Sequence, residues 1–139
     1  MQVEYNQLKT IISGPKKNVI ITTHRGPDGD AMGSSLALFH LLKKLEHNVQ
    51  IITPNDYAYF LHWLPGNKDV IIYEESKEKC KKITEKADLI FFMDFNNIDR
   101  IADYKQCVRN LSSTKILIDH HQDPDYSIAD LVFSDTKSS

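Results

Sequence analysis

Seven imidazole and carboxylate side chains follow apolar runs of the sequence, in three short clusters. They are His24, Asp28, Asp30, Asp94, Asp119, His120 and His121. Nitrogen and carboxylate ligands without thiolates suit Mn²⁺, Mg²⁺, Co²⁺ or Zn²⁺ rather than a structural thiolate zinc site. A carboxylate can also bridge two such ions about 3.5–4 Å apart, the arrangement used for phosphoryl hydrolysis. The residue types therefore predict a divalent-metal phosphoester hydrolase site.

Each of these residues alone is weak evidence for a site. An aspartate at the end of a strand is often only a turn former or a helix cap, and Asp30 is a candidate N-cap for the segment that follows it. Seven such residues at the ends of three expected strands nevertheless favour a functional interpretation.

Apolar runs and helical spacings alternate along the chain, and these elements must bring the three clusters together. Continuous apolar runs predict buried parallel strands, whereas apolar residues three or four positions apart predict helices. The expected strands are 18–23, 48–53, 69–73, 88–93, 115–118 and 128–133, and the expected helices are 3–13, a segment from 30 or 34 to 46, 77–86 and one or two pieces within 98–111. This alternation indicates an α/β domain with a mostly parallel sheet. The carboxyl ends of its strands share one edge, where ligands bind at the switch in strand order.

An aromatic segment lies between the second and third expected strands. Residues 57–64 include Tyr57, Tyr59, Phe60 and Trp63, and Pro65-Gly66 ends the segment. We predict a short helix packed over the sheet here. A surface on which nucleobases stack is the less favoured alternative.

Composition bounds the class of protein. The chain has 139 residues, 41% of them apolar and 26% charged, which is ordinary for one globular domain with its own core. The net charge of -2 does not attract a long polyanion, so the composition disfavours a stand-alone duplex-binding module. A small anionic substrate held through bound cations remains compatible, because the ions reverse the local field.

The cysteines and the termini indicate a cellular compartment. Cys80 and Cys107 lie far apart without metal-binding spacing, which predicts reduced thiols in a cytosolic protein. The first residues lack the basic and apolar blocks of a signal peptide, and no apolar run approaches the length of a membrane span. We therefore expect a cytoplasmic, soluble protein.

Three motifs resemble the first three motifs of the DHH phosphoesterase superfamily, in the family's order. They are His24-x-x-x-Asp28-x-Asp30, Asp94-Phe95-Asn96 and Asp119-His120-His121. The triplet alone is a weak signal, but its combination with the other two motifs is specific. The first motif is similar to that of NrnA-type oligoribonucleases that also act on 3′-phosphoadenosine 5′-phosphate. RecJ-type exonucleases, exopolyphosphatase-related proteins and family II inorganic pyrophosphatases share the metal core.

The resemblance implies a doubly wound, mostly parallel sheet with helices on both faces and two bound Mn²⁺ ions, with Mg²⁺ or Co²⁺ as alternatives. It implies that His24 and Asp28 ligate the first ion. Asp30 and His120 would ligate the second ion, and Asp94 would bridge the two.

The remaining implied roles concern catalysis and substrate. Asp119 would hold the imidazole of the DHH triplet without itself binding the ion, and His121 would face the phosphate or the leaving group. Gly33 and Ser34 would let a helix start close to the site, with backbone N–H groups available to an anion. The expected substrate-binding residues are Asn96, Asn97, Gly33 and Ser34.

The implied function is a metal-dependent phosphodiesterase or phosphatase that uses a water activated by two metals. Its expected partner is short RNA or 3′-phosphoadenosine 5′-phosphate, with no duplex DNA and no membrane, and a homodimer is compatible with it. An exopolyphosphatase or an inorganic pyrophosphatase of the same superfamily is the alternative within the same chemistry. A non-catalytic α/β metal-binding regulatory module is a third interpretation, although a receiver-type site uses carboxylates without paired histidines.

Two parts of the family pattern have no match in the sequence. For the aspartate of the fourth motif, Asp125, Asp130 and Asp135 are candidates by residue type only. The C-terminal DHHA1-type domain, with its glycine-rich substrate-binding motif, is absent. We therefore expect residues 1–139 to be a partial N-terminal DHH domain, with the activity belonging to a longer parent enzyme.

Overall fold

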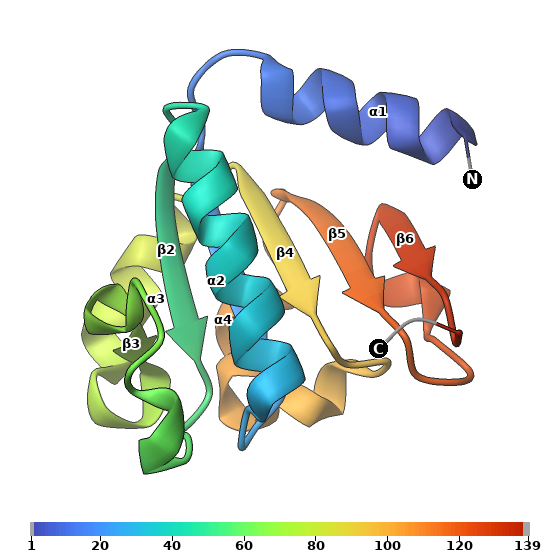
Figure 1. Cartoon of the computed structure of the whole chain (residues 1–139). Helices are drawn as coiled ribbons and strands as arrows, with labels where there is room; N and C mark the ends of the chain where they lie inside the picture. The colour runs from blue at the N-terminus through green and yellow to red at the C-terminus, as the bar shows by residue number, and fades with distance from the viewer. Residues whose placement is uncertain (1, 138–139) are drawn as a thin grey trace.

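Six parallel strands form a single sheet in the computed structural model of this chain, which describes residues 2–137. The strands are β1 (Asn18–Thr23), β2 (Asn48–Thr53), β3 (Ile71–Ile72), β4 (Leu89–Met93), β5 (Thr114–Asp119) and β6 (Leu131–Ser134). Their order across the sheet is β3-β2-β1-β4-β5-β6 (Figure 1). Every neighbouring pair is parallel, which confirms the α/β class expected from the sequence.

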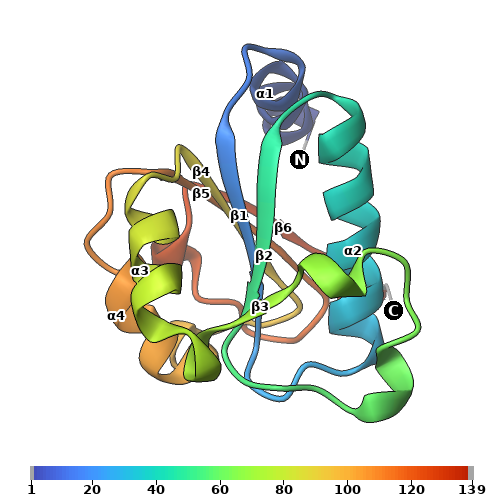
Figure 2. The same cartoon turned by 90° about the vertical axis from the view of Figure 1, so that its left-hand side faces the viewer.

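Helices cover both faces of this sheet (Figure 2). One face carries α1 (Gln2–Ser13) and α2 (Gly29–Lys44), and the other carries α3 (Lys77–Glu85), the 3₁₀ helix η4 (Ile98–Tyr104) and α4 (Lys105–Val108). Short 3₁₀ turns occupy connecting segments: η1 (Tyr59–Leu61), η2 (Asn67–Asp69), η3 (Tyr73–Glu75) and η5 (Tyr126–Ile128). The domain is therefore doubly wound, as expected. Within residues 2–137, no helix has both the length and the apolar character needed to cross a membrane.

The core consists of two apolar clusters, one on each side of the sheet. Because side chains alternate along a strand, β1 serves both clusters: Val19 and Ile21 pack under α2, whereas Ile20 packs toward α3 and η4. All five residues of β4 are buried. Burial on both faces explains why the central strands are continuous apolar runs rather than alternating ones.

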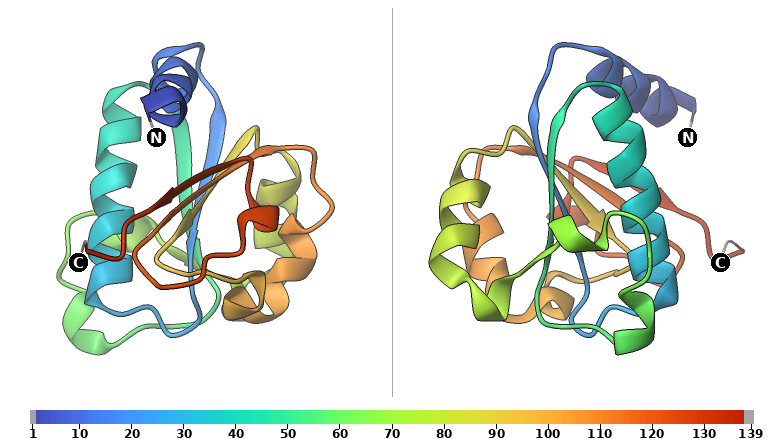
Figure 3. Two further views of the ribbon diagram at one scale, coloured as in Figure 1. Left: turned by 90° about the vertical axis from the view of Figure 1, so that its right-hand side faces the viewer. Right: turned by 60° about the vertical axis from the view of Figure 1, so that its left-hand side comes forward.

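The two ends of the strands differ in what lies against them. α1 lies across the end at which the strands begin, as Figure 3 shows from two directions. His47 fastens α1 there, because its buried ring accepts a hydrogen bond from the Lys17 N–H at 3.1 Å and contacts the Ile12 carbonyl at 2.7 Å. The opposite edge, where the strands end, is therefore left to the connecting loops.

The helix after β1 begins earlier than predicted. α2 starts at Gly29 because Asp28 is its N-cap, with Asp28 Oδ1 accepting from the Ala31 N–H at 3.0 Å. Asp30 is therefore not the cap, and it lies in the first turn of α2.

The predicted helix over 57–64 is wrong. Only η1 is helical there, and the side chains of Tyr59, Phe60 and Trp63 are 90%, 70% and 76% exposed. Tyr57 and Leu61 alone bury their side chains fully within this segment and join the core beneath α2. These two side chains hold the segment against the core, while the other aromatic side chains point to solvent.

Candidate metal centre

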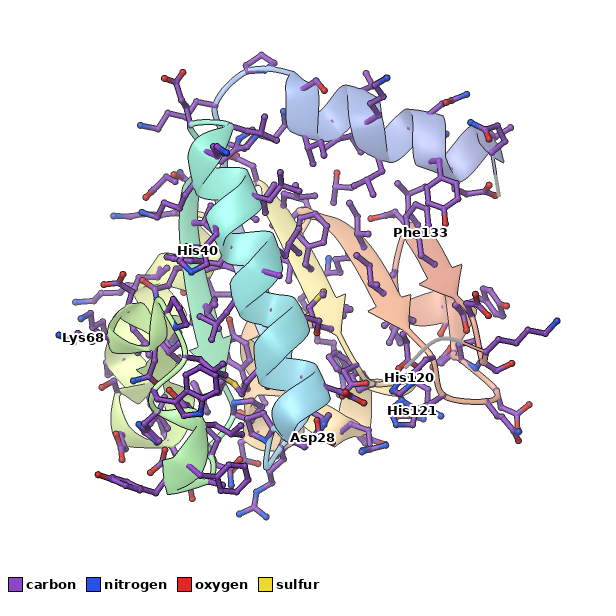
Figure 4. The ribbon with its side chains drawn as sticks, viewed as in Figure 1. Asp28, His40, Lys68, His120, His121 and Phe133 are labelled. Carbon is purple, nitrogen blue, oxygen red and sulfur yellow. The ribbon has the colours of Figure 1, made fainter. Side chains whose placement is uncertain are left out.

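The three clusters of the sequence converge at the edge where the strands end. The chain winds outward from β1 to β3 and then crosses to β4, so the strand order reverses between β1 and β4. His24 directly follows β1, and Asp94 directly follows β4. Figure 4 shows Asp28 at the first turn of α2, with His120 and His121 at the same edge beyond it. This is the place where doubly wound sheets bind ligands.

His24, Asp28 and Asp94 form a first group of candidate ligands, with ligand atoms within 4.8 Å of one another. His24 Nε2 lies 3.5 Å from Asp94 Oδ2 and 3.8 Å from Asp28 Oδ1. His24 Nδ1 lies 2.8 Å from the carbonyl oxygen of Arg25. Since a carbonyl only accepts, Nδ1 carries the hydrogen and Nε2 of the neutral ring keeps its lone pair for a metal.

Asp94, Asp119, His120 and His121 form a second group. His120 Nε2 lies 2.7 Å from Asp94 Oδ1, and His121 Nδ1 lies 2.6 Å from Asp119 Oδ1. Asp94 is the one residue that belongs to both groups. Its carboxylate therefore lies between the two groups of imidazoles, as a bridging ligand would.

The backbone at Asp94 adopts a conformation that few residues tolerate. Its φ is +65°, in the left-handed region, and its N–H donates to the Ile118 carbonyl at 3.0 Å. Non-glycine residues in this region are strained, and such strain concentrates at functional sites. The bond to β5 maintains the turn and directs Asp94 toward His120.

The charges of the site favour an ionised Asp94. The hydrogen bond between His24 and Asp94 raises the pKa of His24, and burial of the ring acts in the opposite direction. The Arg25 carbonyl and the nearby carboxylates add to the increase. Burial by itself raises the pKa of Asp94, but the hydrogen bond from His24 and the charges of the three histidines outweigh it and lower that pKa. The buried carboxylate is therefore an anion in the neutral pH range.

Asp119 provides a test of whether a cation fits. Its Oδ2 atom is buried, and no residue in the described range donates a hydrogen bond to it. A buried polar atom without a partner is costly, and a coordinated cation would remove that cost. With imidazole and carboxylate donors and no thiolate, both groups fit a divalent ion: the first would be held by His24, Asp28 and Asp94, and the second by the group around Asp94 and His120.

A cavity of about 390 Å³ opens beside the second group. Its lining is Gly29, Asp30, Gly33, Ser34, Met93, Asp94, Ile118, Asp119 and His120. Asp30 lines this cavity but belongs to neither ligand group.

A Cβ atom at Gly33 would meet no heavy atom within 4 Å, so this glycine leaves room in the cavity. Because α2 starts at Gly29 and Asp28 accepts from the N–H groups of Ala31 and Met32, the start of α2 offers an anion the N–H groups of residues 29 and 30 rather than those of Gly33 and Ser34.

Asn96 and Asn97 are absent from the lining of this cavity. Asn96 Nδ2 donates to the Gln122 carbonyl at 2.8 Å, which joins the loops after β4 and β5. Asn97 caps η4 by accepting from the Asp99 N–H at 2.9 Å. Both asparagines thus make structural contacts here.

The three aspartates considered for the fourth motif make local contacts. Asp125 Oδ1 accepts from the N–H and hydroxyl of Ser127, Asp130 Oδ2 accepts from the Lys115 N–H, and Asp135 Oδ1 accepts from the Lys137 N–H. None of them belongs to either ligand group of residues 2–137.

Two contacts that the sequence did not reveal support the loop carrying His24 and Asp28. Asn55 Oδ1 accepts from the Gly26 N–H at 2.5 Å, and the Arg100 carbonyl accepts from the Arg25 N–H at 2.6 Å. Gly26 has a φ of +64°, a conformation that favours glycine. The only sequence signal was an asparagine in the turn after β2, which by itself indicates a turn former.

Comparison with known families matches residues 18–139 to the DHH family, N-terminal domain. The chain belongs to the DHH family. Among solved structures, an exopolyphosphatase-related protein from Bacteroides fragilis is 34% identical, with a TM-score of 0.95. The match covers 100% of the present DHH chain and 40% of that protein, so this chain spans less than half of its length.

More distant structures share only the fold with this DHH domain. An alpha-glucosyltransferase in complex with UDP and a 13-mer DNA containing a HMU base is 17% identical over 86% of this chain and 38% of its own, with a TM-score of 0.65. The alpha-glucosyltransferase in complex with UDP is also 17% identical, over 84% of this chain and 34% of its own, with a TM-score of 0.62. A comparison with curated protein sequences gave no match.

Proposed function

We propose that this DHH domain is the metal-binding part of a divalent-metal-dependent phosphoesterase that hydrolyses short oligoribonucleotides or 3′-phosphoadenosine 5′-phosphate. The observation that carries the proposal is the position of Asp94, which belongs to both ligand groups and lies within 3.5 Å of an imidazole on each side. Two bound divalent ions, for which Mn²⁺ is the expected metal, would activate a water and neutralise phosphate oxygens. An NrnA-type enzyme of the cytoplasm, active as a monomer or a homodimer, is the branch we favour.

The side chains of the site have separate tasks in this proposal. His24 presents Nε2 because its Nδ1 is held by the Arg25 carbonyl, and Asp94 presents one oxygen to each group. His121 is held by Asp119 through Nδ1, so its Nε2 can hold or donate a proton. We assign that proton to the leaving oxygen of the substrate, with Asp119 keeping the ring in the required tautomer.

Asp30 is assigned to the second ion, and it lines the cavity beside Asp94 and His120. We assign the substrate phosphate to this cavity because the first turn of α2 lies in its wall and offers N–H groups to an anion. Asn96 and Asn97 are the proposed contacts to the remainder of the substrate.

One observation favours a second candidate. The solved relative that is 34% identical carries the description exopolyphosphatase-related, so a polyphosphate or pyrophosphate substrate is the alternative. Both substrates present phosphate oxygens to the same ligands, and they differ only in the leaving group.

Parallel hydrolysis assays separate these candidates. A dinucleotide, 3′-phosphoadenosine 5′-phosphate, tripolyphosphate and pyrophosphate are each incubated with Mn²⁺ and the protein, both as residues 1–139 and within the full gene product. We expect turnover of the nucleotides that Asp94→Asn abolishes and that Asp130→Asn, which alters a carboxylate outside both ligand groups, preserves. Turnover of tripolyphosphate or pyrophosphate alone would instead identify the second candidate. Metal binding without any turnover would indicate a non-catalytic module.

A further inference from the structure

The loop that follows β2 exposes three large aromatic side chains, Tyr59, Phe60 and Trp63. They are 90%, 70% and 76% exposed, and we call them the aromatic surface. Exposed large aliphatic residues lie elsewhere: Val3 is on α1, Leu41 is on α2 and Leu45 follows α2. Exposed aromatic rings offer flat faces on which other rings can stack.

Contacts beneath the aromatic surface fix its shape. The buried ring of Tyr57 stacks on His62 with their centroids 4.4 Å apart, and Asp56 Oδ1 lies 3.5 Å from His62 Nε2. The hydroxyl of Tyr57 donates to Asn67, which closes the base of the loop. The surface therefore belongs to an anchored loop, so stacking on it costs little ordering entropy.

The loop after β2 is hydrogen-bonded to the loop that carries two of the candidate metal ligands. β2 is parallel to β1, so the loop after β2 emerges at the same edge of the sheet as His24. The Gly26 N–H donates to Asn55 Oδ1 at 2.5 Å, which ties this loop to the one that carries His24 and Asp28. Figure 2 shows the loop after β2 beside the first turn of α2.

A cationic side chain lies in the loop that this hydrogen bond reaches. Arg25 precedes Gly26 and is exposed, and its side chain has no ion-pair partner among residues 2–137. A guanidinium binds phosphate oxygens with good geometry. The arrangement thus combines flat apolar faces with a cation beside a metal centre, which is how single-stranded nucleic acids are held.

We propose that Tyr59, Phe60 and Trp63 stack on nucleobases of a single-stranded oligoribonucleotide whose phosphate lies at the candidate metal centre. The inference rests on the proposed function and deepens it, because it names what the site recognises besides phosphate. Stacking tolerates every base, so recognition is not sequence-specific. A polyphosphate has no bases and gains nothing from this surface.

Trp63 is the only tryptophan of the chain, and its fluorescence reports on the aromatic surface. A short oligoadenylate and tripolyphosphate are titrated separately into the protein in EDTA, which prevents metal-dependent cleavage. We expect saturable quenching by the oligoadenylate and none by tripolyphosphate at the same ionic strength. Quenching by neither ligand, or equally by both, would overturn the inference.

Two substitutions and a matched control locate the effect. Phe60→Ala and Tyr59→Ala are expected to weaken oligoadenylate binding at least about fivefold each, the size of one lost stacking contact. Tyr5→Ala removes a 53% exposed aromatic side chain from α1 and is expected to leave binding unchanged. Circular dichroism confirms that each variant is folded. Equal binding by all variants would contradict the inference.

Kinetics and sedimentation separate this inference from the proposed function. We expect Phe60→Ala to raise the KM for the oligoadenylate and to leave its kcat nearly unchanged, because the aromatic surface binds bases and takes no part in the hydrolysis. Oligoadenylate hydrolysis insensitive to Phe60→Ala would overturn the inference and leave the proposed function intact, whereas quenching without any metal binding or hydrolysis would overturn only the function. Sedimentation could instead show a dimer of the wild-type protein that Phe60→Ala dissociates. If that protein also failed to bind oligoadenylate, the aromatic surface would be assigned to a second copy of the chain and the inference would be overturned.

Discussion

His120 Nε2 lies 2.7 Å from Asp94 Oδ1, while His24 Nε2 faces Oδ2 of the same carboxylate at 3.5 Å. Asp94 follows β4, which lies between β1 and β5, so the side chains that follow β1 and β5 flank Asp94 from both sides. The hydrogen bond from the Asp94 N–H to the Ile118 carbonyl holds the ends of β4 and β5 in register at this point. The topology itself thus creates a carboxylate between two imidazoles.

Asp119→Asn tests the support of His121. The change removes the charged acceptor of the His121 Nδ1 hydrogen, so the orientation and tautomer of the ring are no longer fixed. We also expect the affinity for Mn²⁺ to fall about 10- to 100-fold, because Asp119 belongs to the second ligand group and its buried Oδ2 loses the charge that a cation would neutralise. The metal-free protein should be at least as stable as wild type, because Oδ2 is buried without a hydrogen-bond donor. Calorimetry and urea unfolding measure the two effects.

Asp135→Asn is the matched control for Asp119→Asn. Asp135 follows β6, is exposed and belongs to neither ligand group of the described chain. Unchanged Mn²⁺ affinity in Asp119→Asn, or an equal decrease in both variants, would contradict the assigned role.

The stability of the metal-free protein should decrease as pH rises above about 6.5. The pKa of His24 is raised in the folded state, so its stabilisation is present below the ordinary value of 6.5 and is lost as pH passes the raised value. The pKa of Asp94 is lowered, so its contribution is present above its ordinary value of 3.8 and is lost only in acid. Urea unfolding in EDTA should show this decrease in wild type and a smaller one in His24→Gln. Parallel pH profiles would refute the pairing.

Much of the fold follows from apolar runs, and the exceptions have physical causes. The bounds of β1 and β2 coincide with the prediction, because each strand contains a short set of β-branched apolar residues that begins after an asparagine and ends at threonine. The prediction of a helix over 57–64 that packs on the sheet was wrong because residue type indicates burial only on average. In this segment Tyr57 and Leu61 are the buried side chains. The motifs and the ends of the strands indicated the candidate metal ligands. They did not indicate Asn55 as a support, because that contact depends on how two loops meet.

Gly33→Ala should stabilise the fold. Gly33 lies inside α2, where alanine is favoured over glycine by about 1 kcal/mol, and its added Cβ would meet no heavy atom within 4 Å. We expect a free energy of unfolding higher by about 0.5–1 kcal/mol in urea. Gly26→Ala is the opposite control, since a φ of +64° strains alanine and should lower that free energy. A loss of stability in Gly33→Ala would show that the site tolerates no side chain.

His47→Ala should release α1 from the sheet. The ring bridges the Lys17 N–H and the Ile12 carbonyl, and its loss leaves both groups unsatisfied next to the core. We expect a loss of about 2 kcal/mol in the free energy of unfolding, together with faster proteolysis near Pro15. His40→Ala, which removes one contact of an exposed ring to the Pro65 carbonyl at 2.9 Å, should cost less. An equal cost for both variants would contradict the anchoring role.

The central claim is that Asp94 serves both ligand groups, and calorimetric titration with Mn²⁺ tests it most directly. Wild type should bind Mn²⁺ with proton release below neutral pH, because His24 must lose its proton to coordinate. Asp94→Ala should bind Mn²⁺ at least about tenfold more weakly, since both groups lose their shared carboxylate. Equal Mn²⁺ binding by wild type and Asp94→Ala would contradict the assignment of the site.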